Sequence, residues 1–340
     1  MNNLEKKVLI TDDVHPLLIA GLEANGFHCD YEPNITDTIV RQKINIYNGL
    51  IINSKINVDA AMLDAAAQLE FVARIGAGME IVDLAHARAR GVAVVSAPEG
   101  NRNAVAEHAL GMLLALANQL PIADAEVRQK IWKREARRGF ELAGKTVGIV
   151  GFGHTGSAFA LRLAGLDVKI LAYDKYRNVA DAAKLWQTDA TEEPQYFWKH
   201  NALSFDFVQQ VSLETLQQEA DIISFHLPLN AETKYFCDEI FLKNCKKKVV
   251  IINTSRGNVV ETAALLAALT AEKVRFAALD VFENEKVGTF SAAENLLYDD
   301  LYRRPNVLLS PHVAGWTTES KARLASVLLK KILNIQKSKN

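Results

Sequence analysis

The chain has only three cysteines, Cys29, Cys237 and Cys245, among its 340 residues. Their odd number and wide spacing exclude a disulfide framework and a zinc site of the usual cysteine pattern. No apolar run is long enough to span a bilayer, and the opening MNNLEKKVLITDD leads into a strand pattern instead of the apolar region of a signal peptide. We therefore expect no metal site, no membrane partner and a cytoplasmic location.

An excess of charge of either sign is also missing. The 39 basic residues nearly balance the 40 acidic ones, for a formal net charge of -1. Such a chain has no general attraction for nucleic acid, so any anionic ligand must be bound by a local site. In contrast, hydrophobic residues are plentiful at 49%, and the length is enough for two cores.

Short β-branched runs recur between stretches with helical spacing, a pattern that predicts an α/β protein. Four such runs lie in the first hundred residues: KVLITD, GLIINS, FVARIG and VAVVSAP. Six more follow: TVGIV, VKILAYD, DIISFHLP, KKKVVIINT, RFAALDVF and NVLLSP. The two groups predict two domains, each with a mostly parallel sheet.

Three segments fall outside this alternation. The apolar stretch NAVAEHALGMLLALANQLPIADAEVRQKIW predicts long helices that cross between the domains; a surface for a second subunit and an ordinary buried helix both fit it. Residues 179–210, rich in Trp, Tyr and Phe, predict an ordered insertion. The tail TTESKARLASVLLKKILNIQ predicts a helix whose apolar face needs a partner, for which we expect the first domain.

The stretch GFGHTG has the spacing G-x-G-x-x-G between a predicted strand and a predicted helix. Gly151 allows a tight turn, Gly153 lets a pyrophosphate approach the backbone, and Gly156 permits close packing of helix on strand. The next strand ends at Asp174, 18 residues after Gly156, where a carboxylate can bind a ribose hydroxyl. The pattern predicts NAD rather than NADP, although Lys175 and Arg177 follow directly.

Polar side chains end three successive predicted strands. Arg256 follows VVIINT, the acids Asp280, Glu283 and Glu285 follow RFAAL, and His312 follows NVLLS. A guanidinium binds a carboxylate through two hydrogen bonds, whereas an imidazole exchanges protons near neutral pH. A carboxylate beside an imidazole raises its pKa and fixes its tautomer. The pattern predicts oxidation of a hydroxy acid, although Arg256 alone could equally pair with a helix end or an acid.

The motifs ELAGKTVGIVGFGHTG, FHLPLNAET, INTSRGNVVE, LDVFENE and SPHVAGW resemble those of the D-isomer-specific 2-hydroxyacid dehydrogenase family, and the resemblance covers nearly the whole chain. It implies two doubly wound parallel-sheet domains. A flavodoxin-like substrate domain would comprise residues 1–102 and 314–340, and a Rossmann NAD-binding domain residues 103–313. The implied catalytic residues are Arg256, which binds the 2-oxo acid, His312, the acid/base, and Glu285, its partner.

The resemblance also implies the binding residues. Those for the NAD cofactor are Gly151, Gly153, His154, Thr155, Gly156, Asp174, His226, Pro228, Thr254 and Asp280. Those for the substrate are Ser54, Lys55, Ala77, Gly78, Asn101 and Arg256. We further expect a homodimer or a dimer of dimers.

Within the family the pattern favours 3-phospho-D-glycerate as the substrate. Members acting on it commonly carry Arg-Ser after the third strand, whereas this chain has Asn53, Ser54 and Lys55. Other candidates for binding a phosphate are Arg74, Arg102, Lys133, Arg134, Arg137 and Arg138. Three alternatives stay open: 4-phosphoerythronate, suggested by PHVAGWTTESKAR; an unphosphorylated acid such as glycerate, lactate or glyoxylate; and an NAD(H)-sensing binding protein of the corepressor type.

Overall fold

The computed structural model describes residues 6–187 and 204–338. These residues form two compact units, each with its own parallel sheet. Unit 1 is built from the described residues up to Asn101 and from Trp316 onward, and unit 2 from those of Arg102–Gly315. These boundaries lie one or two residues from the expected ones. Among the described residues, no helix is long and apolar enough to cross a membrane.

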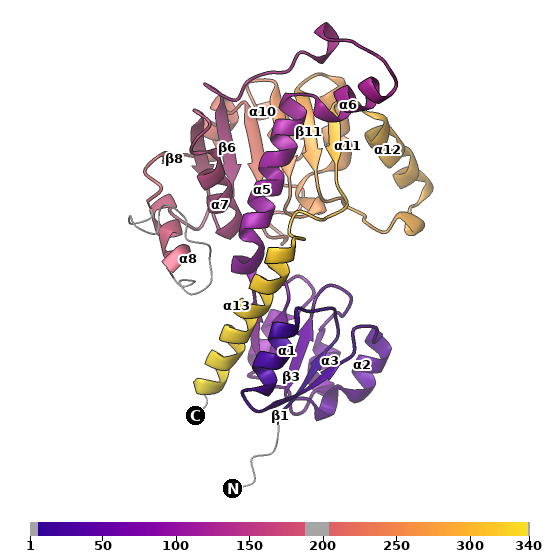
Figure 1. Cartoon of the computed structure of the whole chain (residues 1–340), viewed down its shortest axis with the longest axis vertical. Coiled ribbons are helices and arrows are strands. Elements are labelled where there is room, and N and C mark those ends of the chain that lie inside the picture. The colour runs from indigo at the N-terminus through magenta and orange to yellow at the C-terminus, as the bar shows by residue number, and fades with distance from the viewer. Residues whose placement is uncertain (1–5, 188–203, 339–340) are drawn as a thin grey trace. The chain divides into compact units, whose positions relative to one another are not determined.

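Unit 1 has a sheet of five strands in the order β2-β1-β3-β4-β5. Figure 1 labels β1 and β3 of this sheet. The strands are β1 Lys6–Ile10, β2 Phe27–Tyr31, β3 Gly49–Ile52, β4 Phe71–Arg74 and β5 Ala93–Ser96. The helices are α1 Pro16–Glu23, α2 Asp37–Lys43, η1 Ile44–Ile46, α3 Ala60–Ala65, α4 Leu84–Ala89 and α13 Thr318–Lys337. This is the flavodoxin-like order, as expected. Strand β2 was missed because its residues FHCDY are mostly polar and do not form an apolar β-branched run.

Helix α13 covers one face of the sheet in unit 1. Its buried residues Leu324, Leu328 and Ile332 share a core cluster with Leu18 of α1 and Ile51 of β3. The C-terminal helix therefore packs on the first domain.

Unit 2 has a seven-stranded sheet in the order β12-β11-β10-β9-β6-β7-β8. Its strands are β6 Thr146–Val150, β7 Lys169–Tyr173, β8 Val208–Gln210, β9 Ile222–Phe225, β10 Val249–Asn253, β11 Val274–Leu279 and β12 Val307–Leu309. The first six in sequence follow the Rossmann order, whose switch point lies between β6 and β9. Together the two sheets confirm the predicted fold class.

Helices cover both faces of this sheet. In β10, Val250 and Ile252 join a cluster with α5 and α7, whereas Val249 and Ile251 join one with α9, α10, α11 and α12. The helical segments are α5 Pro98–Ala117, α6 Leu120–Arg128, η2 Glu135–Arg137, α7 His154–Leu163, η3 Val179–Ala183, α8 Lys184–Gln187, α9 Leu213–Glu219, α10 Glu239–Asn244, η5 Gly257–Val259, α11 Thr262–Thr270, η6 Val287–Thr289 and α12 Ala292–Arg303. Strands buried on both faces explain the continuous apolar runs in the sequence.

The expected insertion at 179–210 needs correction where the structure describes it. Its end contributes β8, the one strand of unit 2 that was not among the six predicted for this domain, and its start forms η3 and α8. Trp186 donates a hydrogen bond to Ser157 of α7 (3.2 Å), and the ring of Phe205 meets that of Phe152 at 5.3 Å. Residues 188–203 lie outside the described residues. The described ends of this segment thus belong to the core of unit 2.

Candidate active site

The glycine turn between β6 and α7 uses its three glycines in two ways. A Cβ at Gly151, whose φ is +91°, would lie 2.5 Å from the His226 carbonyl oxygen, and one at Gly156 would lie 2.1 Å from the Gly151 oxygen. The chain itself needs these two glycines. A Cβ at Gly153 would meet nothing within 4 Å, so the space before α7 is open. The first N–H groups of a helix lack intrahelical partners and suit a pyrophosphate there.

Asp174 lies beside this turn, just after β7. One carboxylate oxygen accepts a hydrogen bond from the Phe152 N–H (2.8 Å), and the other accepts from the N–H groups of Tyr176 (2.9 Å) and Arg177 (3.0 Å). These backbone donors fix the carboxylate at the carboxyl end of the sheet. It is therefore well placed for a ribose hydroxyl of a dinucleotide.

Two further residues predicted to bind the cofactor have buried polar atoms without a hydrogen-bond partner among the described residues. They are Nδ1 of His226 and Oγ1 of Thr254. Burial lowers the pKa of His226 to about 3, so the ring is neutral, and its Nε2 is bonded to Ser224 (2.9 Å). Because unpaired buried polar atoms are costly, both suit a ligand that offers hydrogen bonds. With the glycine turn and Asp174, these residues fit NAD.

For the remaining predicted cofactor residues, the structure gives position but no direct sign of a ligand contact. His154 and Thr155 occupy the first turn of α7, and Pro228 lies in the loop after β9, where its carbonyl accepts a hydrogen bond from Thr233 (2.6 Å). Their contacts with a cofactor stay predictions.

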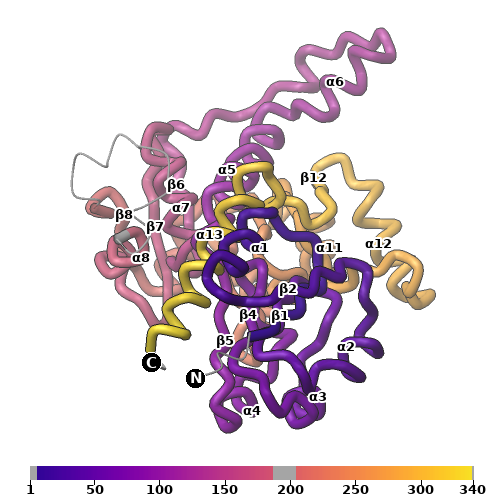
Figure 2. Tube along the Cα trace, turned by 60° about the horizontal axis from the view of Figure 1, so that its bottom comes forward, coloured from indigo at the N-terminus to yellow at the C-terminus, as the bar shows by residue number. Residues whose placement is uncertain are grey.

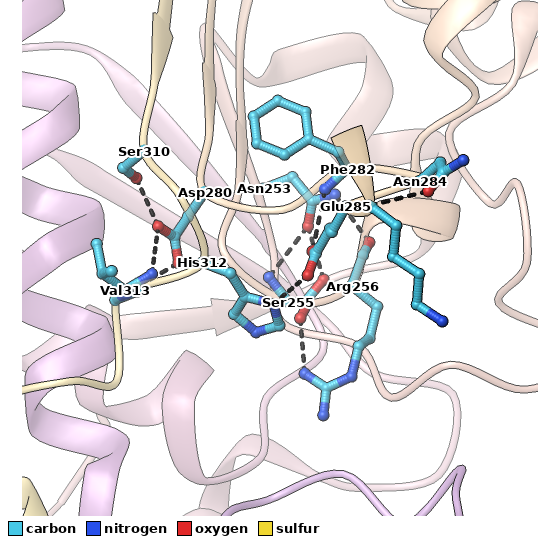
Figure 3. Close-up of polar contacts among 12 residues, drawn as sticks. Asn253, Ser255, Arg256, Asp280, Phe282, Asn284, Glu285, Ser310, His312 and Val313 are labelled. Carbon is cyan, nitrogen blue, oxygen red and sulfur yellow. Dashed lines mark hydrogen bonds and ion pairs between the residues drawn. The ribbon is translucent and has the colours of Figure 1, made fainter. Parts of the chain in front are cut away.

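Three neighbouring strands carry the predicted catalytic side chains at their carboxyl ends (Figure 3). Arg256 follows β10, Glu285 follows β11 and His312 follows β12. Nδ1 of His312 lies 2.8 Å from a carboxylate oxygen of Glu285, and their side chains are 45% and 40% exposed. The structure thus joins an imidazole and a carboxylate that a ligand can reach.

The carboxylate of this pair stays charged. Burial raises the pKa of Glu285, but the hydrogen bond and the positive charge of His312, with that of Arg256, outweigh it and lower the pKa overall. A charged carboxylate only accepts hydrogen bonds, so Nδ1 carries a proton and Nε2 is left for a substrate. Glu283 has a different role, since it binds the Tyr235 hydroxyl (2.6 Å) and the Thr262 N–H (2.7 Å).

The arginine loop rests directly on the loop that carries Glu285. The Asn253 side chain accepts hydrogen bonds from Ser255 (3.1 and 2.8 Å) and donates one to the Arg256 carbonyl (2.9 Å). A Cβ at Gly257 would lie only 1.8 Å from the Phe282 carbonyl oxygen. A glycine directly after Arg256 is therefore required, because the two loops touch backbone to backbone.

Asp280, which was predicted to contact the cofactor, is fully buried and accepts hydrogen bonds from the chain itself. Its contact with the cofactor stays a prediction. Its donors are the Ser310 hydroxyl (2.5 Å) and the N–H groups of Val313 and Ala314 (2.9 Å each), and its carbonyl accepts from the His312 N–H (2.7 Å). His312 has φ +56°, an uncommon conformation for a histidine. Asp280 thus holds the loop that presents His312.

His108 on α5 was missed by the sequence analysis. Its Nε2 lies 2.9 Å from the Ser310 hydroxyl and 3.5 Å from the Asp280 carboxylate. No local motif marks it, because its partners lie about two hundred residues further along the chain.

The predicted substrate loops both belong to unit 1. The buried Arg74 joins them, since its Nε donates to the Asn53 carbonyl (2.9 Å) and its guanidinium also donates to the Gly78 carbonyl. The exposed residues Ser54, Lys55 and Ala77 lie in these loops. Oδ1 of Asn101 is buried without a hydrogen-bond partner among the described residues. Arg74 therefore sets the spacing of the two loops.

Other arginines predicted to bind a phosphate are used by the fold. Arg102 is fully buried, lies 3.6 Å from the centre of the Trp186 ring and donates to the Leu185 carbonyl (3.1 Å). Arg137 makes two hydrogen bonds to Glu126, both of 2.8 Å. Burial makes the prediction wrong for Arg102, and the ion pair weakens it for Arg137.

Unit 2 therefore defines a dinucleotide-binding domain with a histidine–glutamate pair at the carboxyl edge of its sheet. The chain belongs to the D-isomer specific 2-hydroxyacid dehydrogenase family, because the model of that family's NAD binding domain matches residues 110–197 and 190–314, more than half of the chain. Its cofactor is accordingly NAD.

Relatives with known names fall in the same family. The chain is 39% identical to D-3-phosphoglycerate dehydrogenase of Mycobacterium bovis over 276 residues, 81% of this chain and 47% of that protein. It is 30% identical to the protein of that name in Archaeoglobus fulgidus over 331 residues, 97% and 57% of the two chains. The apo-structure of D-lactate dehydrogenase from Escherichia coli has a TM-score of 0.73 at 27% identity, covering 98% and 97%. The chain thus spans about half the length of the curated relatives it matches.

Proposed function

We propose that the protein oxidises a small D-2-hydroxy acid to its 2-oxo acid, and catalyses the reverse, with NAD. The observation that carries the proposal is the 2.8 Å pair of His312 and Glu285, with Arg256 on the adjacent loop. A proton must leave the hydroxyl group as C2 is oxidised, and a neutral imidazole can take it near neutral pH. NAD, when bound, would accept the hydride from C2.

Each side chain has a distinct role in this proposal. His312 takes the hydroxyl proton at Nε2, and Glu285 fixes the ring and stabilises its charged form. Arg256 holds the substrate carboxylate and polarises the oxygen on C2. The backbone at Ala77 and Gly78 would bind the rest of the substrate, with Asn101, Ser54 and Lys55 as further contacts.

The favoured substrate is 3-phospho-D-glycerate, which would make the protein a phosphoglycerate dehydrogenase of serine biosynthesis. The names of its relatives support this. Asn53 in the position where arginine is common favours a second candidate, an unphosphorylated acid such as D-lactate or glycerate. Lys55 is the exposed cation of this loop, and in the structure its amino group binds the Pro33 carbonyl.

The test is NADH absorbance with 3-phospho-D-glycerate, 4-phosphoerythronate, D-glycerate, D-lactate and glyoxylate. Replacement of His312 by Ala should lower kcat by about 10²-fold or more and leave NADH binding nearly intact. His86→Ala is the matched control, because His86 forms a similar exposed pair with Asp64 (2.8 Å) in unit 1. Equal loss in both variants, or full activity without His312, would refute the mechanism. No turnover of any acid despite NADH binding would favour the corepressor-type alternative.

A homodimer is part of the proposal. Helix α6 has no buried residue, and the chain around it forms an arm that extends from the rest of unit 2 (Figure 2). Leu120, Val127 and Trp132 on this arm are 56%, 51% and 76% exposed. Apolar side chains grouped on such an arm favour a contact with a second copy. The three free thiols favour a reducing compartment such as the cytoplasm.

A further inference from the structure

Four charged residues lie in the loops at the carboxyl end of β7, beside the glycine turn. Asp174, Lys175 and Arg177 come from the loop after β7, and Glu232 comes from the loop after β9. The Glu232 carboxylate lies 2.8 Å from the Lys175 amino group, and its second oxygen accepts a hydrogen bond from the Tyr176 hydroxyl. Glu232 thus binds the side chains of Lys175 and Tyr176, the two residues that directly follow Asp174.

The loop that carries Glu232 is fixed by its own hydrogen bonds. The side chain of Asn230 accepts from the N–H groups of Glu232 (2.9 Å) and Thr233 (3.1 Å), and the Thr233 hydroxyl donates to the Pro228 carbonyl (2.6 Å). The hydrogen bonds from Lys175 and Tyr176 lower the pKa of Glu232, so it is charged at neutral pH. The loop therefore presents a permanent negative charge to the turn after β7.

These charges bear on the choice between NAD and NADP. The two cofactors differ by a phosphate on the ribose hydroxyl, with about two negative charges at neutral pH. That phosphate would lie next to Asp174, near Lys175 and Arg177. With both carboxylates ionised, the four side chains carry no net charge, and Lys175 is already bonded to Glu232.

We propose that Glu232 is a specificity residue that excludes NADP, because it adds a negative charge near the ribose and keeps Lys175 from binding a phosphate. The proposal rests on the proposed function, since it concerns the cofactor of the same site. Loss of Glu232 removes one negative charge and releases one cation at the same place.

The test is direct binding of NADH and NADPH, measured by fluorescence titration without substrate. Glu232→Gln keeps the size of the side chain and removes its charge. Its affinity for NADPH should rise about 5- to 10-fold at low ionic strength, with a much smaller change for NADH, and salt should reduce the gain. Asp174→Ser combined with Glu232→Gln should bind NADPH more tightly than Asp174→Ser alone. Adding Lys175→Ala to Glu232→Gln should remove most of the gain.

Glu219→Gln is the matched control. Glu219 also forms an exposed pair with a lysine, Lys169, at 2.6 Å, but at the opposite end of β7. Exposed ion pairs contribute little to stability, so both variants should fold. If both Glu232→Gln and Glu219→Gln bind NADH normally and have the same affinity for NADPH, the role of Glu232 is refuted. The proposed function would be unaffected. No NADH binding by the unchanged protein would refute the cofactor and, with it, this inference.

Discussion

Gly257 is a position where the structure predicts a large effect of a single methyl group. In Gly257→Ala the new Cβ would lie 1.8 Å from the Phe282 oxygen, 1.9 Å from the Phe282 carbonyl carbon and 2.5 Å from the Glu283 nitrogen. All three are backbone atoms, which cannot rotate away. Overpacking costs about 1 to 3 kcal/mol where side chains shift, so we expect the upper end, about 3 kcal/mol. In a domain of about 150 to 250 residues this lowers the Tm by about 6 to 12 °C.

The assay is thermal unfolding followed by circular dichroism, together with NADH binding and turnover. Gly153→Ala is the contrasting variant, because its Cβ meets no atom within 4 Å. It should keep its Tm within about 2 °C and weaken NADH binding by about 10-fold or more, since a pyrophosphate needs that space. Gly288→Ala also has open space and should change neither quantity. An unchanged Tm in Gly257→Ala would show that the two loops do not touch as described.

Three further variants test other parts of unit 2. Hydrogen bonds from Asn284 and then Ser291 lower the pKa of Glu294 from 4.5 to about 2, so the stabilisation by its carboxylate is complete above pH 4.5 and is lost as the pH falls toward 2. In Glu294→Gln the free energy of unfolding in urea should therefore fall less steeply over that pH range. The same pH dependence in both proteins would contradict this. Trp186→Phe removes the hydrogen bond to Ser157 beside the glycine turn and should weaken NADH binding by about 2- to 5-fold with a nearly unchanged Tm. The same NADH affinity in the variant and the unchanged protein would refute an effect of this hydrogen bond on the turn. His108→Phe removes the hydrogen bond to the Ser310 hydroxyl and should lower kcat by about 10-fold without changing the KM for NAD. A parallel change in kcat and KM would indicate that His108 has only a structural role.

The sequence was sufficient for the fold class and for the arrangement of the three strand ends. Parallel strands buried on both faces leave continuous apolar runs, and polar residues after them lie at one edge of the sheet. Strands β2 and β8 were missed because their residues, FHCDY and VQQ, are too polar to form an apolar run. Glu285 was separated from Glu283 only by the family resemblance, since spacing alone favours neither.

The supporting contacts could not be predicted from the sequence. Asp280 has the motif position of a ligand contact, but the motif gives no sign that its two carboxylate oxygens accept hydrogen bonds from the loop after β12. Arg102 has the charge of a phosphate ligand, but packing against Trp186 buries it. Both outcomes depend on which residues approach from distant parts of the chain, and local composition carries no signal for that.

Arg256, Glu285 and His312 all belong to one compact unit. Any rigid movement of unit 1 against unit 2 therefore leaves the distances among them unchanged. If the His312–Glu285 pair transfers the proton as proposed, its geometry needs no reorganisation at the moment of reaction. Under the proposed mechanism, the geometry of proton transfer is therefore a property of a single domain.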